Sequence, residues 1–149
     1  MNSDPVPADN FRVHLIDDDP DHILLIGRAI RAAQPSAAVH TCQDGEEALA
    51  ELRALATLPD LILLDINMGG LDGFAVLTAL KGDAHLKAIP VVMLTSSALS
   101  SDVARAYELG ASGYISKPSY LQDLRAVLGN TLLYWSAMRR ATPPAGGPP

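Results

Sequence analysis

The chain has 149 residues and a mass of 15.7 kDa, which is the size of one ordinary domain. Hydrophobic residues make up 48% of it and charged residues 19%, so it has enough apolar side chains to form a core. The net charge of −6 argues against partners that are nucleic acids or anionic membranes, and a single cysteine, Cys42, excludes an internal disulfide or a cysteine-based zinc site. We therefore expect a cytoplasmic protein without a signal peptide or a membrane span.

Two terminal segments have the composition of tails. Residues 1–10 contain two prolines among small polar residues, and residues 141–149 are almost entirely Pro, Gly and Ala. Such segments bury too little apolar surface to offset their ordering entropy. We expect disordered tails at 1–10 and 141–149 and one folded domain over 11–140, standing alone without an output domain.

Between these tails, short apolar runs alternate with segments of helical periodicity. The alternation predicts an α/β fold, a doubly wound, five-stranded parallel sheet with helices on both faces. The flavodoxin-like strand order 2-1-3-4-5 suits five such units. The expected strands are Arg12–Asp17, Ala37–Cys42, Asp60–Asp65, Pro90–Thr95 and Ser112–Lys117.

Aspartates mark the starts of the first three helices. Asp19, Asp44 and Asp72 each precede a segment of helical periodicity, and an aspartate side chain accepts hydrogen bonds from the first backbone amides of a helix. The fourth and fifth helices are expected over Asp102–Leu109 and from a Ser119 cap to about Arg140.

Polar side chains stand at the ends of the strands. Asp17 and Asp18 follow the first strand, Asp65 the third, Thr95 the fourth and Lys117 the fifth. In a parallel sheet these ends share one edge, and the expected order places the first strand beside the third. Three carboxylates in one cleft repel each other unless a cation neutralises them, and Mg²⁺ prefers oxygen ligands. The sequence therefore predicts a Mg²⁺ site held by Asp17 and Asp18.

Asp65 is the candidate nucleophile, because it follows a central strand that is apolar throughout. An aspartate carboxylate can attack phosphorus to form an aspartyl phosphate. Lys117 and the metal would balance the charge of the phosphoryl oxygens, and Thr95 would donate a hydrogen bond. These parts predict phosphoryl transfer onto Asp65 itself.

The motifs DDDP, LILLDINM followed by LDG, PVVMLTS and GYISKP occur in this order over about residues 11–130. Together they resemble the receiver domain of two-component response regulators. The resemblance implies that Asp65 is the phosphoacceptor and Lys117 the phosphate-binding cation. It also implies that Mg²⁺ binds Asp65 and Asp18 directly, Asp17 through water, and the backbone carbonyl of Asn67.

The resemblance further implies a conformational switch. Thr95 and Tyr114 would be the switch pair, although Tyr114 also suits a half-buried aromatic on an edge strand. The bond between Lys117 and Pro118 would be cis. Gly69 stands where the family usually has proline, which would loosen the loop after the phosphoacceptor.

The resemblance implies a signalling module rather than a turnover enzyme, with a sensor histidine kinase as its partner. The long last helix is similar to that of the single-domain regulators that accompany bacterial phytochromes, which points to a bacteriophytochrome as the kinase. An aspartate-nucleophile, Mg²⁺-dependent phosphohydrolase is the enzymatic alternative, but it would need a cap region for which this chain is too short. A flavin carrier would need a neutral phosphate-binding loop where this chain has three aspartates. A binding module that works without phosphorylation stays open.

The last helix is expected to outrun its sheet, because about 22 residues span roughly 33 Å and a strand only about 17–20 Å. We expect a homodimer through apolar residues that its own domain leaves uncovered. The alternative is a bend near Gly129 that folds the segment back. The expected interface residues are Leu132, Tyr134, Trp135 and Met138.

The four histidines show no metal-ligand spacing along the chain. We expect all four to be structural or solvated. They are His14, His22, His40 and His85.

Overall fold

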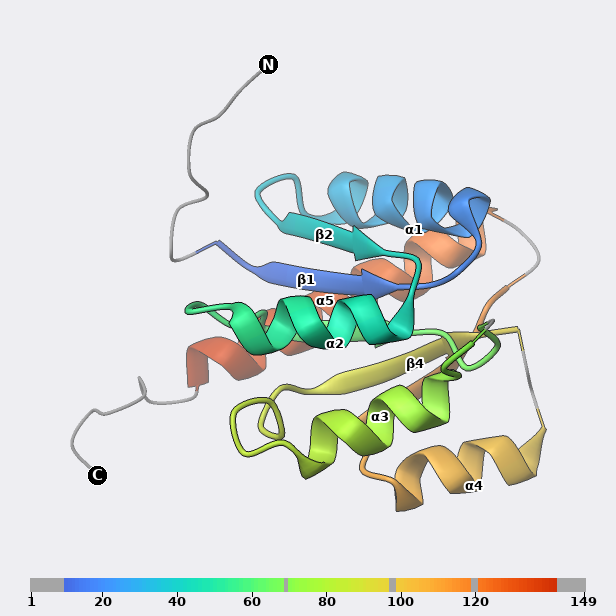
Figure 1. The fold of residues 1–149 in the computed structure, drawn as a ribbon. Helices are drawn as coiled ribbons and strands as arrows, with labels where there is room; N and C mark the ends of the chain where they lie inside the picture. Colours follow the sequence, from blue (N-terminus) through green and yellow to red (C-terminus); the bar gives the residue numbers. More distant parts are fainter. Residues whose placement is uncertain (1–9, 69, 97–98, 119–120, 142–149) are drawn as a thin grey trace.

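The computed structural model describes residues 10–68, 70–96, 99–118 and 121–141. Gly69, Ser119 and nearly all of the two expected tails lie outside the described residues. Within them, five strands alternate with five helices (Figure 1). The strands are β1 (Arg12–Ile16), β2 (Ala38–Cys42), β3 (Leu61–Leu64), β4 (Val91–Thr95) and β5 (Gly113–Ser116), and the helices are α1 (Pro20–Ala33), α2 (Gly45–Ala54), α3 (Gly73–Gly82), α4 (Ser100–Glu108) and α5 (Leu121–Ala141).

The five strands form one parallel sheet in the order β2-β1-β3-β4-β5, which confirms the predicted topology. β3 is central and all four of its residues are buried, as its unbroken apolar run predicts. β2 is an edge strand with a half-buried and exposed pattern. The order places the carboxyl ends of β1 and β3 side by side.

The core lies in two layers, one on each face of the sheet. Helices α2, α3 and α4 cover one face, and α1 and α5 cover the other (Figure 1). Alternate residues of each strand enter alternate layers, so Met93 packs beneath α3 and α4 while Val92 and Leu94 face α1 and α5.

The predicted helix starts are confirmed for the first three helices. The side chains of Asp19, Asp44 and Asp72 each accept a hydrogen bond from a backbone amide of the first turn. Helix α4 begins at Ser100, two residues earlier than the sequence suggests, and its N-cap Leu99 has no side-chain hydrogen bond to mark it.

Helix α5 is unbroken over 21 residues and packs against α1 on the same face of the sheet. The expectation that its second half is uncovered is therefore wrong for two residues. Leu132 is 1% exposed, and Trp135 is half-buried against the same core layer. The reason is that α1 lies beside α5 and extends the surface on which α5 packs.

Polar contacts also fasten the end of α5 to its own domain. The Ser136 hydroxyl donates to Oε1 of Gln34 at 3.2 Å, and Arg139 Nε lies 3.3 Å from Asp60 Oδ1. The helix neither bends near Gly129 nor leaves the domain.

No cis peptide bond occurs in the described part of the chain, so the bond between Lys117 and Pro118 is trans and that expectation is corrected. Trans is the lower-energy form even before proline, by about 0.5–1 kcal/mol.

Candidate functional site

The carboxyl edge of the sheet brings Asp17 and Asp65 together. Ile16 and Leu64 are register partners at the ends of β1 and β3, and each is followed directly by one of the two aspartates. The Asp65 backbone amide donates to the Ile16 carbonyl at 3.0 Å, which continues the ladder one step past the strands. Asp17 is 1% exposed and Asp65 6%, so two buried carboxylates lie at this edge of the sheet.

Lys117 supplies the positive charge at this place. Its Nζ lies 2.7 Å from Asp17 Oδ2 and 3.4 Å from Asp65 Oδ2, and its side chain is only 10% exposed. The lysine follows β5, and its backbone amide donates to the Thr95 carbonyl at 2.7 Å, which fixes where the side chain starts. A buried ammonium between two buried carboxylates offsets part of their mutual repulsion.

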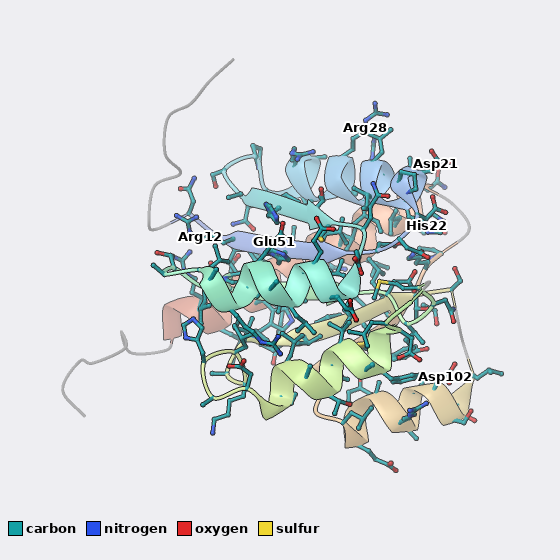
Figure 2. All side chains as sticks on the ribbon, in the orientation of Figure 1. Arg12, Asp21, His22, Arg28, Glu51 and Asp102 are labelled. Carbon is teal, nitrogen blue, oxygen red and sulfur yellow. The ribbon has the colours of Figure 1, made fainter. Side chains whose placement is uncertain are left out.

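His22 is the third hydrogen-bond partner of Lys117, and no motif in the sequence indicates this role. Its Nδ1 lies 2.9 Å from Lys117 Nζ, while its Nε2 lies 3.4 Å from Asp19 Oδ2. Since an ammonium only donates, Nδ1 is the acceptor and the ring proton sits on Nε2. Figure 2 shows His22 near the start of α1, beside the end of β1. The three N–H donors of Lys117 thus have three acceptors: Asp17, His22 and Asp65.

Burial raises the pKa of Asp17 above its usual value, and the hydrogen bond from Lys117 works in the opposite direction. The nearby Asp65 adds to the upward shift. The backbone amide of Asp19 donates to Asp17 Oδ1 at 3.0 Å and holds the carboxylate in place. The two hydrogen bonds, from Lys117 and from the Asp19 amide, favour the ionised form of Asp17 and oppose the effect of burial.

Asp18 is exposed, at the rim of the same edge, directly after the buried Asp17. On the other side, the Asn67 backbone amide donates to Asp65 Oδ1 at 3.2 Å. This hydrogen bond holds the Asn67 backbone next to the carboxylate of Asp65, and the metal-ligand role that the resemblance implies for the Asn67 carbonyl stays a prediction.

Thr95 and Tyr114 lie on the same face of the sheet. Thr95 is fully buried at the end of β4, and Tyr114 is half-buried on β5 against the core layer beneath α3 and α4. The register pairs Thr95 with Ser116 and Met93 with Tyr114, so the two side chains are diagonal neighbours on adjacent strands. The switch role that the resemblance implies for Thr95 and Tyr114 stays a prediction.

Gly73 is a positioning residue that the sequence reasoning did not single out. A Cβ atom at this residue would collide with the backbone carbonyl of Asp65 and with Ile66. The close approach lets the Gly73 amide donate to the Ile66 carbonyl at 2.9 Å and brings the start of α3 against the loop. The signal was present in the motif LDG, where a glycine directly follows a helix N-cap.

The donor set suits a hard divalent cation. Oxygens of Asp17 and Asp65 and a ring nitrogen of His22 lie within 4.8 Å of one another. Mg²⁺ needs one or two carboxylates and keeps several water molecules, so the two aspartates suffice and His22 is not the preferred type of ligand.

A parallel sheet of this order, with buried aspartates and a lysine at its carboxyl edge, defines the receiver class of signalling domains. Residues 13–129 match the family model of the response regulator receiver domain. The probable methanogenesis regulatory protein FilR2 of Methanothrix harundinacea is 34% identical over 141 residues, which cover 92% of this chain and 91% of FilR2. The chain therefore belongs to the response regulator receiver family.

Two solved structures are similar over most of their length. The phosphorylated cyanobacterial phytochrome response regulator RcpA is 36% identical with a TM-score of 0.81, covering 87% of this chain and 96% of RcpA. The Mn²⁺-bound response regulator Rcp1 is 30% identical with a TM-score of 0.75, covering 91% of this chain and 99% of Rcp1. In contrast, the chain spans only 47% of the transcriptional regulatory protein PrrA of Mycobacterium leprae and 23% of PleD of Caulobacter vibrioides.

Among the described residues, no helix combines the length and apolar character needed to cross a membrane.

Proposed function

We propose that this protein accepts a phosphoryl group on Asp65 and passes the signal on by a change of partner or of self-association. The observation that carries the proposal is Lys117, whose ammonium lies between the buried carboxylates of Asp17 and Asp65. Such an arrangement holds a nucleophilic carboxylate next to a cation that can also stabilise the negative oxygens of a phosphoryl group bound to that carboxylate.

In the transfer step, an Asp65 carboxylate oxygen forms a bond to phosphorus while the bond between phosphorus and the donor's leaving group breaks. With a phosphohistidine donor the leaving group is an imidazole nitrogen, which takes up a proton. The Asn67 amide already holds Asp65 Oδ1 at 3.2 Å and so orients the carboxylate for attack. Lys117 moves its hydrogen bonds toward the new phosphoryl oxygens, and the Thr95 hydroxyl donates to another.

Asp17, Asp18, Asp65 and the Asn67 carbonyl would hold Mg²⁺. The metal, when bound, supplies positive charge to the oxygens of the group in transfer. The carboxylate chemistry of the site supports this, as does the Mn²⁺-bound form of the similar protein Rcp1. Asp18 is suited to the direct role because it lies exposed at the rim, where a hydrated ion arrives.

The proposed partner is a sensor histidine kinase, and specifically a bacterial phytochrome. The similarity to RcpA, a phytochrome response regulator, supports this choice. A cytoplasmic location fits a single buried cysteine without a disulfide. The proposed folding unit is residues 11–140.

We also propose a homodimer through α5, with a revised set of residues. Leu132 and Trp135 belong to the domain's own core layer, but Leu133 is 70% exposed, Tyr134 56% and Met138 43%. These three side chains form the apolar surface that a second copy would cover.

The phosphohydrolase and the phosphorylation-independent module are the competing functions. Incubating the protein with Mg²⁺ and a small phosphodonor separates the three. Slow formation of one stable, acid-labile adduct that Asp65→Asn abolishes supports the receiver function. Rapid multiple turnover of a phosphoester would favour the hydrolase, and no adduct on a folded protein would favour the module.

A further inference from the structure

A second cluster of metal-ligating side chains lies away from the carboxyl edge, on the face of the sheet that α2 covers. His14 and His40 are register partners in the middle of β1 and β2, and their ring centroids are 4.6 Å apart. Glu51 reaches them from α2, with Oε1 at 3.2 Å from His40 Nε2 and 3.9 Å from His14 Nε2. Figure 2 shows Glu51 between α2 and these two strands. The ligand atoms of all three residues lie within 4.8 Å of one another.

The His14 ring has an unmet requirement. The residue is 3% exposed, and its Nε2 is buried without a hydrogen-bond partner. An orphaned buried nitrogen costs about 1–3 kcal/mol, so native structures rarely keep one without a reason. Burial, with a contribution from His40, also lowers the pKa of His14 to about 4, and Glu51 opposes this shift. The ring is then neutral at pH 7, which is the form that binds metals.

We propose that His14, His40 and Glu51 form a site for a divalent transition metal, Zn²⁺ above all. Two imidazoles and one carboxylate form a ligand set that suits Zn²⁺, whereas Mg²⁺ is bound mainly by oxygen ligands. Bonds of about 2.0–2.1 Å in a tetrahedral site place donor atoms roughly 3.3–3.4 Å apart. The distances of 3.2 and 3.9 Å from Glu51 to the two rings require shifts of less than about 1 Å. The metal would give the orphaned His14 nitrogen its missing partner.

The cluster is open to an arriving ion and its water ligands. A groove of 510 Å³ borders all three residues, with Val39, Leu55 and Pro59 among its other walls. A metal with three protein ligands needs one more, and a water molecule in the groove can supply it. The bound ion would link the edge strand β2 to both β1 and α2. It would therefore stabilise β2, which pairs with only one other strand.

The test is titration of the full chain with Zn²⁺, in excess Mg²⁺ so that the aspartate site is saturated. We expect one equivalent to bind with a dissociation constant of about 1 μM or tighter and to raise Tm. Co²⁺ in place of Zn²⁺ should give the absorption of a four-coordinate site with nitrogen and oxygen ligands.

His40→Gln and Glu51→Gln should each weaken Zn²⁺ binding at least about 100-fold. Both side chains are partly exposed, so neither variant loses core packing. His85→Gln is the matched control and should bind Zn²⁺ like the parent, because His85 is exposed and contacts the Leu55 carbonyl instead of the cluster. Affinity unchanged in His40→Gln, or lost in Asp65→Asn but kept in Glu51→Gln, would overturn the proposal, as would the absence of binding below about 100 μM.

Discussion

Lys117 Nζ lies 2.7 Å from Asp17 Oδ2, although 100 residues separate the two in the chain. Both are almost buried, and Lys117 also contacts Asp65 and His22. The lysine therefore compensates part of the negative charge of the two buried carboxylates at the carboxyl edge of the sheet.

Removing this lysine should destabilise the protein. In Lys117→Met, Asp17 remains buried without its main counter-charge, and we expect a loss of about 3 kcal/mol in the free energy of unfolding at pH 7 with a chelator present. Urea denaturation measures the loss. The double variant Asp17→Asn/Lys117→Met should recover part of the loss, because it removes the carboxylate that lies closest to Lys117, while Asp65 still lacks the lysine that lay 3.4 Å away. Equal stability of Lys117→Met and the parent would show that the pair carries no net energy.

Gly73 should be intolerant of a side chain. Gly73→Ala sets a Cβ against the Asp65 carbonyl, so the loop after β3 must shift, at a cost of about 2–3 kcal/mol. Phosphorylation should slow, because Asp65 moves with the loop. Gly82→Ala, at the other end of α3, is the control: nothing lies within 4 Å of its added Cβ, and we expect a gain of about 0.5 kcal/mol. A tolerated Gly73→Ala would contradict the packing described here.

Phosphorylation should repack Tyr114 through Thr95. The phosphoryl group draws the Thr95 hydroxyl toward Asp65, and the diagonal Tyr114 ring turns into the space. In Thr95→Val, which keeps the shape and removes the donor, a phosphate mimic on Asp65 should leave the ring where it was. NMR signals of the Tyr114 ring report the change. A ring that moves equally in both proteins would rule out this switch.

The stability of the metal-free protein should fall as the pH decreases through the range of His14. The folded-state pKa of about 4 lies below the usual value of 6.5, so the unfolded chain binds more protons between these limits. The contribution of neutral His14 to the free energy of unfolding is fully present above pH 6.5. It is lost as the pH falls to 4, a decrease of about 3 kcal/mol at most. The free energy of unfolding, measured in a chelator across this pH range, should depend less steeply on pH for His14→Gln than for the parent. Equal slopes would mean that His14 is not held neutral by the fold.

The proposed dimer should depend on the outer face of α5. Leu133→Glu with Tyr134→Ser places polar groups on that face without touching the buried Leu132. We expect a monomer by light scattering at micromolar concentration, where the parent is a dimer. Leu99→Glu, at the 65% exposed N-cap of α4, should leave the dimer intact. A dimer that survives Leu133→Glu/Tyr134→Ser but is lost in Leu99→Glu would instead place the interface at α4.

Sequence reasoning reached the sheet order and the aspartate, threonine and lysine positions because these signals are local. A strand end followed by Asp17 or Asp65 is visible in a few residues, and the shared edge then follows from parallel pairing. The aspartate N-caps at Asp19, Asp44 and Asp72 are equally local.

The features that sequence reasoning missed depend on register and on packing between helices. His14 meets His40 only through the register of β1 with β2. His22 meets Lys117 only because the lysine side chain extends from the end of β5 to Asp17 and Asp65, at the ends of β1 and β3. The burial of Leu132 depends on how far α1 extends beside α5. No short sequence motif indicates any of these contacts.

The measurement that tests the central claim most directly is the identity of the phosphorylated residue. The protein is incubated with Mg²⁺ and a small phosphodonor, the acyl phosphate is trapped by reduction with borohydride, and the digest is sequenced by mass spectrometry. We predict one modified residue, Asp65, with no modification in Asp65→Asn or when Mg²⁺ is withheld. Modification of another residue, or undiminished labelling of Asp65→Asn, would contradict the proposed function.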